Sequence, residues 1–420
     1  MLTSFTVTNY RSFVDPTRIE LRPLTLLFGP NNAGKSALLR VLPLIAESIR
    51  DGGRDSLKLG EASRDGSFDD LVSRLRPGRA LGLELAWAPD ASYAAQIRYL
   101  PELYRQVITE LKASLEGHKI TARWIPEEDP QGRLGNRYEL SSPSNAEEVW
   151  ETRLEFAGLA PGLADEGADQ VTRTLIRLRK NLQRIATGIQ WLGALRAVPL
   201  RRFPLGGAPP LRLDPDGSGF TKVLFFDKKA QRGGLWGEVS DWFEEHFHQV
   251  LELVEVAEEG YLALSPVEAA GLRIPLADTG EGLAQILPVL VALAMARRPN
   301  DAPQLVALEQ PELHLHPAAE VALGEHLAEI AAAPDPPTLV VETHSENLML
   351  SVQLRIAEGS LPPDAVGAYW VERLEDGRSL ARQVEFDDAG RTSGWPEGVF
   401  SEDIHLARQM FRLRRERSES

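Results

Sequence analysis

The sequence predicts an α/β fold, a mixed β-sheet flanked by helices, that carries a mainly helical insertion. Three apolar segments of strand length indicate the sheet: LTLLF at 24–28, LVALE at 305–309 and TLVVET at 338–343. Helical patterns at 36–49 and 317–333 follow the first two of these segments. Apolar strands that alternate with helices are typical of a sheet covered on both faces.

These patterns divide the chain into three parts. Residues 1–91 contain the first strands and the first helix. From residue 92 to 190 the pattern is mostly helical, interrupted by a polar stretch at 126–148, and we interpret this part as an insertion. Residues 191–420 return to strands and helices and include a closing hairpin and a tail.

The composition is that of a globular protein. The chain has 420 residues, of which 43% are hydrophobic and 25% charged. Without cysteine, disulfides and thiolate chemistry are excluded, and a cytoplasmic location is expected. The apolar run 286–296 is too short to span a bilayer, and the N-terminus lacks the basic region of a signal peptide, so no membrane contact is expected. The net charge of −15 argues against a surface built broadly for DNA.

One local segment is basic in spite of that charge. Residues 171–202 contain no acid, and Arg173, Arg177, Lys180 and Arg184 are spaced to lie on one face of a helix. Two interpretations remain open. The residues form the solvated face of an amphipathic helix, or they contact a polyanion or an acidic partner.

A phosphate-binding loop follows the first buried strand. The segment from Gly29 to Ser36 fits the pattern G-x-x-x-x-G-K-[ST] and lies between a strand and a helix. Its backbone N–H groups would contact phosphate oxygens, Lys35 would reach the β- and γ-phosphates, and Ser36 would hold Mg²⁺. The residues assigned to the nucleotide are Gly29, Asn31, Asn32, Ala33, Gly34, Lys35 and Ser36.

An acid ends the strand at 305–309. In nucleotide-hydrolysing sheets an acid at this position holds Mg²⁺, so Ser36 and Glu309 are the expected metal ligands. A second acid, which polarises the attacking water, usually follows, but here the residue is Gln310. A glutamine orients water without accepting its proton, so slow hydrolysis is expected. Glu312 is a candidate substitute for the missing base.

Two further motifs accompany these. The segment Asp278–Gln285, with Gly280, Glu281 and Gly282, precedes an apolar helix and suits an anion, which suggests contact with a nucleotide held by another subunit. The alternative is a flexible connection. His344, after the strand 338–343, is expected to bond the γ-phosphate, although a lone histidine is often only a core residue.

His314 and His316 alternate near Glu312, and one interpretation of this spacing is a metal site. Nothing in the sequence fixes the third and fourth ligands that such a site needs. The alternative, which we favour, is that the two histidines shape the loop between strand and helix, near a dimer seam.

The order of these motifs resembles the ATP-binding-cassette class of ATPases, and within it the soluble branch of RecF, Rad50/SMC and OLD-like proteins. NYRSF, GPNNAGKSALL, WLGALRAVP, GEGLAQILPVL, EQPELHLHP and ETHSENL resemble the AAA15-type, DUF3696-type single-chain proteins of bacterial defence loci. The segment GWPEGVFSED at 394–403 is similar to that group's closing segment. The resemblance implies an ABC-type ATPase head that uses ATP and Mg²⁺.

The resemblance also implies roles for individual residues. Glu309 takes the metal-acid position, Gln310 the usual position of the catalytic glutamate, and His344 that of the switch histidine. Arg11 matches a position near the nucleotide, and Asp278–Gln285 stands for the signature loop that completes the opposite protomer's site. No glutamine lies near 68–71, where the Q-loop is expected.

Several functions follow from this resemblance. The leading hypothesis is an ATPase that forms a dimer or higher homo-oligomer around ATP and controls DNA or a protein partner, such as a nuclease or effector encoded nearby, in anti-phage defence. The alternatives are a RecF-like DNA-repair ATPase and a nucleotide-gated sensor or scaffold that barely hydrolyses ATP. A nuclease in its own right is disfavoured, because only 75 residues follow Ser345.

Overall fold

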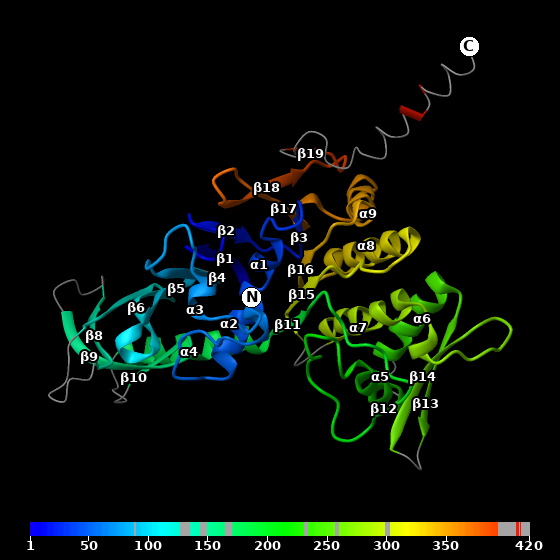
Figure 1. Ribbon diagram of the computed structural model, residues 1–420, viewed down its shortest axis with the longest axis horizontal. Coiled ribbons are helices and arrows are strands. Elements are labelled where there is room, and N and C mark those ends of the chain that lie inside the picture. The colour runs from blue at the N-terminus through cyan, green and yellow to red at the C-terminus, as the bar shows by residue number, and fades with distance from the viewer. Residues whose placement is uncertain are drawn as a thin grey trace.

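The computed structural model describes residues 1–87, 90–126, 135–142, 149–163, 170–230, 234–256, 260–298 and 303–393, with residues 409, 410 and 412. The segment 394–403 lies outside the described residues. Figure 1 shows a central sheet that contains β3, β15 and β16, with a second sheet and α4 on one side of it and a small third sheet on the other. Among the described residues, none of the helices has the length and apolar character needed to cross a membrane.

The central sheet has seven strands and is mixed, as predicted. Its order is β11-β15-β16-β3-β17-β18-β19. The neighbours from β11 to β17 pair in parallel, and β18 and β19 add antiparallel strands. The strands are β3 (Leu24–Phe28), β11 (Ile189–Leu192), β15 (Leu305–Glu309), β16 (Thr338–Glu342), β17 (Val366–Arg373), β18 (Ser379–Phe386) and β19 (Thr392–Ser393).

Both faces of this sheet are covered, because successive side chains of its strands enter two different cores. Leu27, Ala307 and Val340 belong to the core shared with α1 and α2, whereas Leu26 and Val341 belong to the core shared with α7, α8 and α9. The helices are α1 (Lys35–Leu39), α2 (Val41–Arg50), α7 (Glu281–Ala296), α8 (Pro317–Ala332) and α9 (Glu346–Ala357).

The helix expected at 36–49 is two helices that meet at Arg40. Arg40 ends α1 and precedes α2. Pro43 explains the break, because it has no N–H to donate to the carbonyl of Leu39 one turn earlier. The break leaves the Arg40 side chain directed toward the end of β15, where it bonds Glu309.

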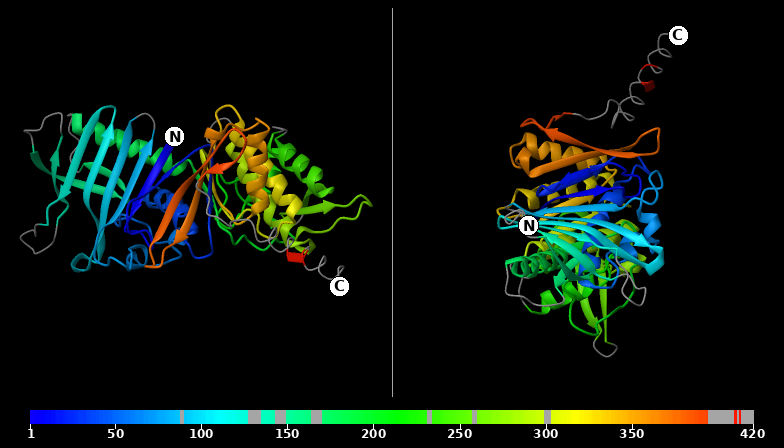
Figure 2. Two further views of the ribbon diagram at one scale, coloured as in Figure 1. Left: turned by 90° about the horizontal axis from the view of Figure 1, so that it is seen from above. Right: turned by 90° about the vertical axis from the view of Figure 1, so that its left-hand side faces the viewer.

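The prediction of a mainly helical insertion at 92–190 is wrong. Six strands fill most of this part, and α4 (Gln170–Thr187) is its one long helix among the described residues. The strands continue a nine-stranded antiparallel sheet, in the order β10-β9-β8-β7-β6-β5-β4-β1-β2, so the expected boundary near residue 92 falls inside a sheet. Figure 2 shows these long strands side by side at one end of the molecule. The strands are β1 (Leu2–Thr8), β2 (Thr17–Glu20), β4 (Leu81–Trp87), β5 (Ala91–Leu100), β6 (Arg105–Leu115), β7 (His118–Trp124), β8 (Arg137–Ser141), β9 (Val149–Ala157) and β10 (Ala160–Leu163).

Burial in this sheet follows a period of two. In β5, Tyr93, Ala95 and Ile97 are buried, and the residues between them are more exposed. The outward positions carry residues with good helix propensity, such as Gln96 and Lys112. Cross-strand packing of the inward face outweighs that weak local preference.

Helix α4 presents the two faces that its spacing predicted. Leu175, Leu178 and Leu182 are buried, whereas Arg173 and Arg184 are exposed. The helix contacts α2 and β10, and therefore braces the nine-stranded sheet against the helices that follow the phosphate-binding loop.

A smaller unit lies on the other side of the central sheet. It combines α5 (Phe220–Lys229) and α6 (Leu235–Phe247) with a three-stranded sheet of order β12-β14-β13. The strands are β12 (Phe203–Pro204), β13 (Val250–Val256) and β14 (Tyr261–Val267). Residues of this unit, such as Phe243 and Leu264, share one core with α7, which joins the unit to the central sheet.

Gly158 allows the nine-stranded sheet to pack closely against α2. It lies in the turn between β9 and β10 with φ 61°, and a Cβ there would lie 1.7 Å from the carbonyl oxygen of Ser48 in α2. Gly117, in the turn between β6 and β7, also has a positive φ of 81°, but a Cβ there would have open space around it.

We expect Gly158→Ala to lower the free energy of unfolding by about 2–4 kcal/mol, because it combines a steric clash with an unfavourable φ. Gly117→Ala carries only the φ penalty of about 1 kcal/mol and is the matched control. Urea unfolding of both variants measures the difference. Equal losses would mean that the sheet and α2 are not held by this close approach.

Candidate nucleotide site

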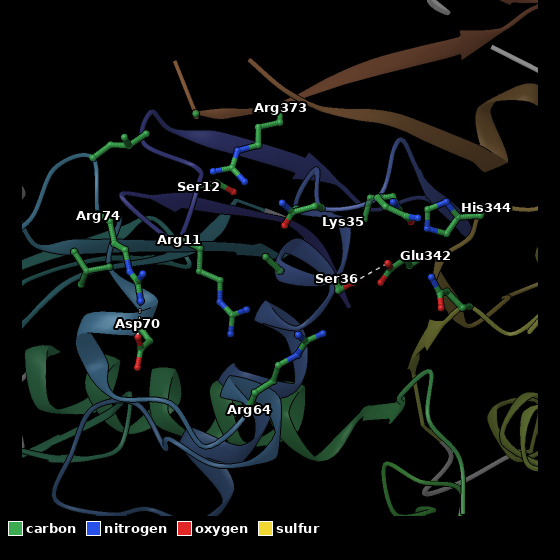
Figure 3. A pocket seen from close by; sticks show the side chains of 18 residues that line it. Arg11, Ser12, Lys35, Ser36, Arg64, Asp70, Arg74, Glu342, His344 and Arg373 are labelled. Atoms are coloured by element: carbon green, nitrogen blue, oxygen red, sulfur yellow. Dashed lines mark hydrogen bonds and ion pairs between the residues drawn. The ribbon is translucent and has the colours of Figure 1, made fainter. Parts of the chain in front are cut away.

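A pocket of about 560 Å³ opens at the C-terminal ends of the parallel strands, where α/β sheets bind ligands. Figure 3 shows side chains from the phosphate-binding loop, from β16 and from several loops directed toward it. It brings together many residues assigned from the sequence: Arg11, Asn31, Asn32, Gly34, Lys35, Ser36, Gln310 and His344.

The loop before α1 has the conformation that its glycines require. Gly29 has φ 143°, and a Cβ there would lie 1.9 Å from the carbonyl oxygen of Val371 in β17. Ser379 Oγ, at the start of β18, donates to the carbonyl oxygen of Ala33 at 2.6 Å. The strands β17 and β18 therefore support the loop from behind, which fixes its backbone toward the pocket.

Lys35 lies beneath the loop. Its Nζ donates to the carbonyl oxygens of Gly29 and Pro30, both at 2.8 Å, and the residue is only 3% exposed. Burial lowers the pKa of Lys35, and the carboxyl groups of Glu342 and Glu312 partly oppose that change. The buried ammonium is thus a charge held next to the place where phosphate oxygens would lie.

Ser36 contacts an acid that the sequence did not single out. Its Oγ donates to Oε1 of Glu342 at 2.7 Å, the bond drawn as a dashed line in Figure 3. Glu342 lines the pocket but is only 3% exposed. Burial and the nearby Glu309 together raise the pKa of Glu342 to about 7, against the lowering effects of the Ser36 bond and of the Lys35 and Arg40 charges.

One signal in the sequence could have identified Glu342. The strands β15 and β16 both end in glutamate, and in the parallel register Glu309 lies beside Glu342. Adjacent parallel strands that end in the same residue type place both side chains at the same edge of the sheet.

Glu309 is buried beside the pocket and does not line it. Arg40 donates to both of its carboxylate oxygens at 2.7 Å, and Trp191 Nε1 donates to Oε1 at 3.0 Å. The Arg40 guanidinium also lies over the Trp191 ring at 5.4 Å, and Arg196 donates to the Glu309 carbonyl oxygen. The structure therefore brings Glu309 to Arg40 and not to the hydroxyl of Ser36.

Two residues after Glu309, Gln310 and Glu312, are candidates for acting on the attacking water. Of these two, only Gln310 is among the residues that line the pocket. Gln310 lines the pocket, and its N–H donates to the carbonyl oxygen of Glu342 at 2.8 Å. Glu312 is turned toward the backbone of the next strand's loop, where the His344 N–H donates to it at 2.8 Å. Burial lowers the pKa of the His344 imidazole, and Lys35 lowers it further, so the neutral ring is favoured.

The glycine-rich segment 278–285 contributes no residue to the lining of this pocket. Gly280 precedes α7, and Gly282 meets the loop of His314, whose carbonyl oxygen would lie 2.5 Å from an added Cβ. Arg201 forms two hydrogen bonds with Asp278. Within one chain, Gly280, Glu281 and Gly282 therefore do not line the pocket of the phosphate-binding loop.

His314 and His316 have partners other than a metal. His314 Nε2 lies 3.4 Å from a carboxylate oxygen of Glu281, and the His316 side chain accepts from the Ala318 N–H at the start of α8. Within the residues that the structure describes, no three His, Asp or Glu side chains form a group able to hold a metal ion. A Mg²⁺ ion at the pocket would therefore depend on hydroxyl, phosphate or water ligands as well as carboxylate.

The pocket also holds basic residues that sequence reasoning missed. Arg64, Arg74 and Arg373 line it together with Arg11. Guanidinium groups suit phosphate oxygens, but these residues come from segments far apart in the chain, including the end of β17, so no sequence pattern marks them. Asp70, from the segment where the Q-loop was expected, lines the pocket too and contacts Arg74 at 3.2 Å.

Two family models match the sequence. Residues 1–69 match the AAA ATPase domain, and residues 213–351 match a family described as "AAA domain, putative AbiEii toxin, Type IV TA system". The two matches fall on separate parts of the chain. The first part contains the phosphate-binding loop, and the second contains Gln310, Glu342 and His344.

Solved structures of SMC proteins are similar in outline. An SMC head domain from Thermotoga maritima aligns with 12% identity and a TM-score of 0.43, over 91% of this chain and 99% of that chain. An Smc head domain from Pyrococcus furiosus, bound to the C-terminal domain of ScpA, aligns with 11% identity and a TM-score of 0.44, over 91% and 96%. No curated protein matches the sequence significantly. These similarities are too low to assign a function.

We expect Arg40→Met to lower the free energy of unfolding by about 3–5 kcal/mol, because it leaves the buried Glu309 carboxylate without its counter-charge. The double variant Arg40→Met/Glu309→Gln removes both charges, and its glutamine can still accept from Trp191. It should therefore recover most of the loss.

Urea unfolding of wild type, both single variants and the double variant measures this coupling. The exposed pair Arg391–Asp387 is the control, and Arg391→Met should change stability by less than about 1 kcal/mol. Additive losses from Arg40→Met and Glu309→Gln would show that the two side chains do not depend on each other.

Proposed function

We propose that this protein binds ATP with Mg²⁺ in the pocket, hydrolyses it slowly, and forms a dimer around the nucleotide whose closure controls a partner. The observation that carries the proposal is the pocket itself. It lies on a phosphate-binding loop and is faced by Lys35, Ser36, Glu342 and His344. The ATPase-domain matches on both parts of the chain support it.

In this proposal, different residues of the pocket bind the phosphates and the metal ion. The N–H groups of the loop and Lys35 take the β- and γ-phosphates, and the surrounding arginines add positive charge. Mg²⁺ would be held by Ser36 and a buried carboxylate, and when bound it neutralises charge on the phosphates. A neutral His344 is suited to donate a hydrogen bond toward the γ-phosphate, because its ring keeps one N–H.

Gln310 limits the rate in this proposal. Its side chain lines the pocket and can orient a water molecule, but an amide cannot take the proton that the water loses. Glu312 is buried outside the pocket lining, with one oxygen bonded to the His344 N–H, and so does not replace the base in this arrangement. Slow turnover would leave the protein mostly in its ATP-bound state.

We expect Gln310→Glu to raise the rate of phosphate release by at least about tenfold, since general-base catalysis contributes about 10²–10⁴-fold in favourable cases. A coupled phosphate assay under saturating ATP measures it. The control Gln383→Glu adds the same charge on the exposed outer part of β18 and should leave turnover unchanged. An unchanged rate in Gln310→Glu would mean that another group already acts as the base.

The dimer proposal has two supports. The first is the separation of Gly280–Gly282 from the pocket, which leaves this helix start available to a nucleotide on a second copy. The second is an exposed apolar loop, which we define as residues 195–211. In it Leu195 is 86% and Val198 81% exposed, and Leu200 and Leu211 are exposed as well.

This apolar loop is tied to both halves of the proposed composite site. Arg196, between the exposed residues, is buried and donates to the carbonyl oxygen of Glu309 at 3.0 Å. Arg201 bonds the carboxylate of Asp278 at 2.6 and 2.7 Å. The loop therefore bridges the end of β15 and the glycine-rich segment, at the place where a second copy would meet the nucleotide.

We expect the variant Leu195→Asp/Val198→Asp to bind ATP as wild type does but to remain monomeric, because charge replaces the apolar surface that dimerisation would bury. Light scattering after gel filtration, with and without ATP, measures the mass. Lys35→Ala should lose both ATP binding and the ATP-dependent dimer. Tyr104→Asp is the control, since Tyr104 is also 86% exposed but lies in the turn between β5 and β6. ATP-dependent dimers of the double aspartate variant would contradict the proposed surface.

A role in defence is the favoured setting for this ATPase. The description of the family that matches residues 213–351 names a toxin of a toxin–antitoxin system, which supports that setting over RecF-like DNA repair. The basic face of α4 is exposed and offers a surface for DNA or an acidic partner. Co-purification of the protein with and without ATP tests whether a nuclease or other effector binds.

A further inference from the structure

We propose that Glu342, rather than Glu309, is the carboxylate that holds Mg²⁺ together with Ser36. The inference rests on the proposed binding of Mg²⁺–ATP and names the residue that would bind the metal. The sequence pointed to Glu309, because an acid at the end of that strand is the usual ligand in related sheets. Four observations on this chain favour Glu342.

The first observation is position in the sheet. The strand β16 lies between β15 and β3, and Glu342 is paired in register with both Glu309 and Leu27. Neighbouring strands lie about 4.8 Å apart, so the end of β16 is one strand closer to the phosphate-binding loop than the end of β15. Glu342 is thus the nearer of the two acids to the loop that begins after β3.

The second observation is the contact with Ser36. The hydroxyl of this residue is the metal ligand that the loop supplies, and it lies 2.7 Å from Oε1 of Glu342. Two oxygen ligands of one Mg²⁺ ion lie close together because each is about 2.1 Å from the metal. Ser36 and Glu342 already meet this requirement, whereas the carboxylate of Glu309 bonds Arg40 and Trp191.

The third observation is a difference in charge balance. Both oxygens of Glu309 accept from Arg40, whose side chain is itself largely buried and stacked over Trp191. Breaking such a buried pair costs about 3–5 kcal/mol, which opposes any movement of Glu309 toward a metal. Glu309 is therefore a positioning residue that holds Arg40 and the end of β15.

The fourth observation is the free oxygen of Glu342. Its Oε2 is buried and has no hydrogen-bond partner, and no salt bridge to Glu342 occurs among the described residues. A buried carboxylate oxygen without a partner is costly, so the arrangement is suited to a cation. The residue also faces the pocket, as Figure 3 shows, so a cation bound there would contact phosphate oxygens as well.

The test compares two carboxylates for their effect on metal-dependent nucleotide binding. The variants are Glu342→Gln and the charge-balanced Arg40→Met/Glu309→Gln, both in the full chain. Glutamine keeps the size of the side chain and can still accept from Ser36. Calorimetry measures ATP affinity with Mg²⁺ and with EDTA, and electron paramagnetic resonance measures the fraction of Mn²⁺ bound in the presence of ADP.

We expect Mg²⁺ to raise the ATP affinity of wild type by at least about tenfold, or about 1.4 kcal/mol. Glu342→Gln should lose this gain and its bound Mn²⁺, while its affinity in EDTA stays within about threefold of wild type. The charge-balanced double variant should keep the metal dependence. Thermal unfolding without metal is the folding control, and Glu342→Gln should unfold no earlier than wild type, because it removes a buried carboxylate that has no salt-bridge partner in the described part of the chain.

Two results would overturn the assignment. Retained metal dependence in Glu342→Gln would exclude Glu342, and loss of it in the double variant would return the metal to Glu309. Absence of ATP binding by wild type is a different result, because it would remove the proposed function itself. The binding measurement on wild type therefore separates the two failures.

Discussion

The buried ion pair between Arg40 and Glu309 is the interaction on which the geometry of the site depends. Arg40 stands at the break between α1 and α2, and Glu309 ends β15, so the pair fixes the helices after the phosphate-binding loop to the edge of the sheet. Trp191 of β11 joins the same contact from the next strand. Three elements that are far apart in the sequence are thereby held in one arrangement around the pocket.

The pair also decides what the two acids at this edge can do. The positive charge of Arg40 balances the charge of Glu309. Of these two acids, Glu342 is therefore the one with a buried oxygen that lacks a partner. Two adjacent carboxylates cannot both remain charged at low cost in a buried setting, so an arginine beside one of them leaves the second for a cation or a proton. The neighbours of the two acids therefore distinguish them: Glu309 is paired with an arginine, whereas Glu342 has one oxygen without a partner.

Much of the site could be predicted from the sequence because its motifs are local. The loop Gly29–Ser36, the strand before it, and the position of Gln310 and His344 beside the pocket follow from patterns within a few residues. The ion pair of Glu309 could not be predicted, because its partner Arg40 is 269 residues away in the chain. The arginines of the pocket come from segments far apart in the chain and share no regular spacing.

The error over residues 92–190 has a similar cause. Strands such as β5 and β6 carry helix-forming residues on their outward face, and only the burial of every second residue marks them as strands. Their pairing partners lie on neighbouring hairpins, and the sheet continues strands that begin the chain. The secondary-structure preference of individual residues does not reveal such cross-strand contacts. The strands of the central sheet are easier to recognise, because they are apolar on both faces.

The support of the phosphate-binding loop by β17 and β18 has a mechanical consequence. Gly29 lies against the backbone of Val371, and Ser379 Oγ bonds both the Ala33 carbonyl oxygen and the Ser12 hydroxyl. The hairpin formed by β17 and β18 is therefore in direct contact with the phosphate-binding loop, through Val371 and Ser379. A displacement of the β17–β18 hairpin would therefore also displace the backbone of the phosphate-binding loop.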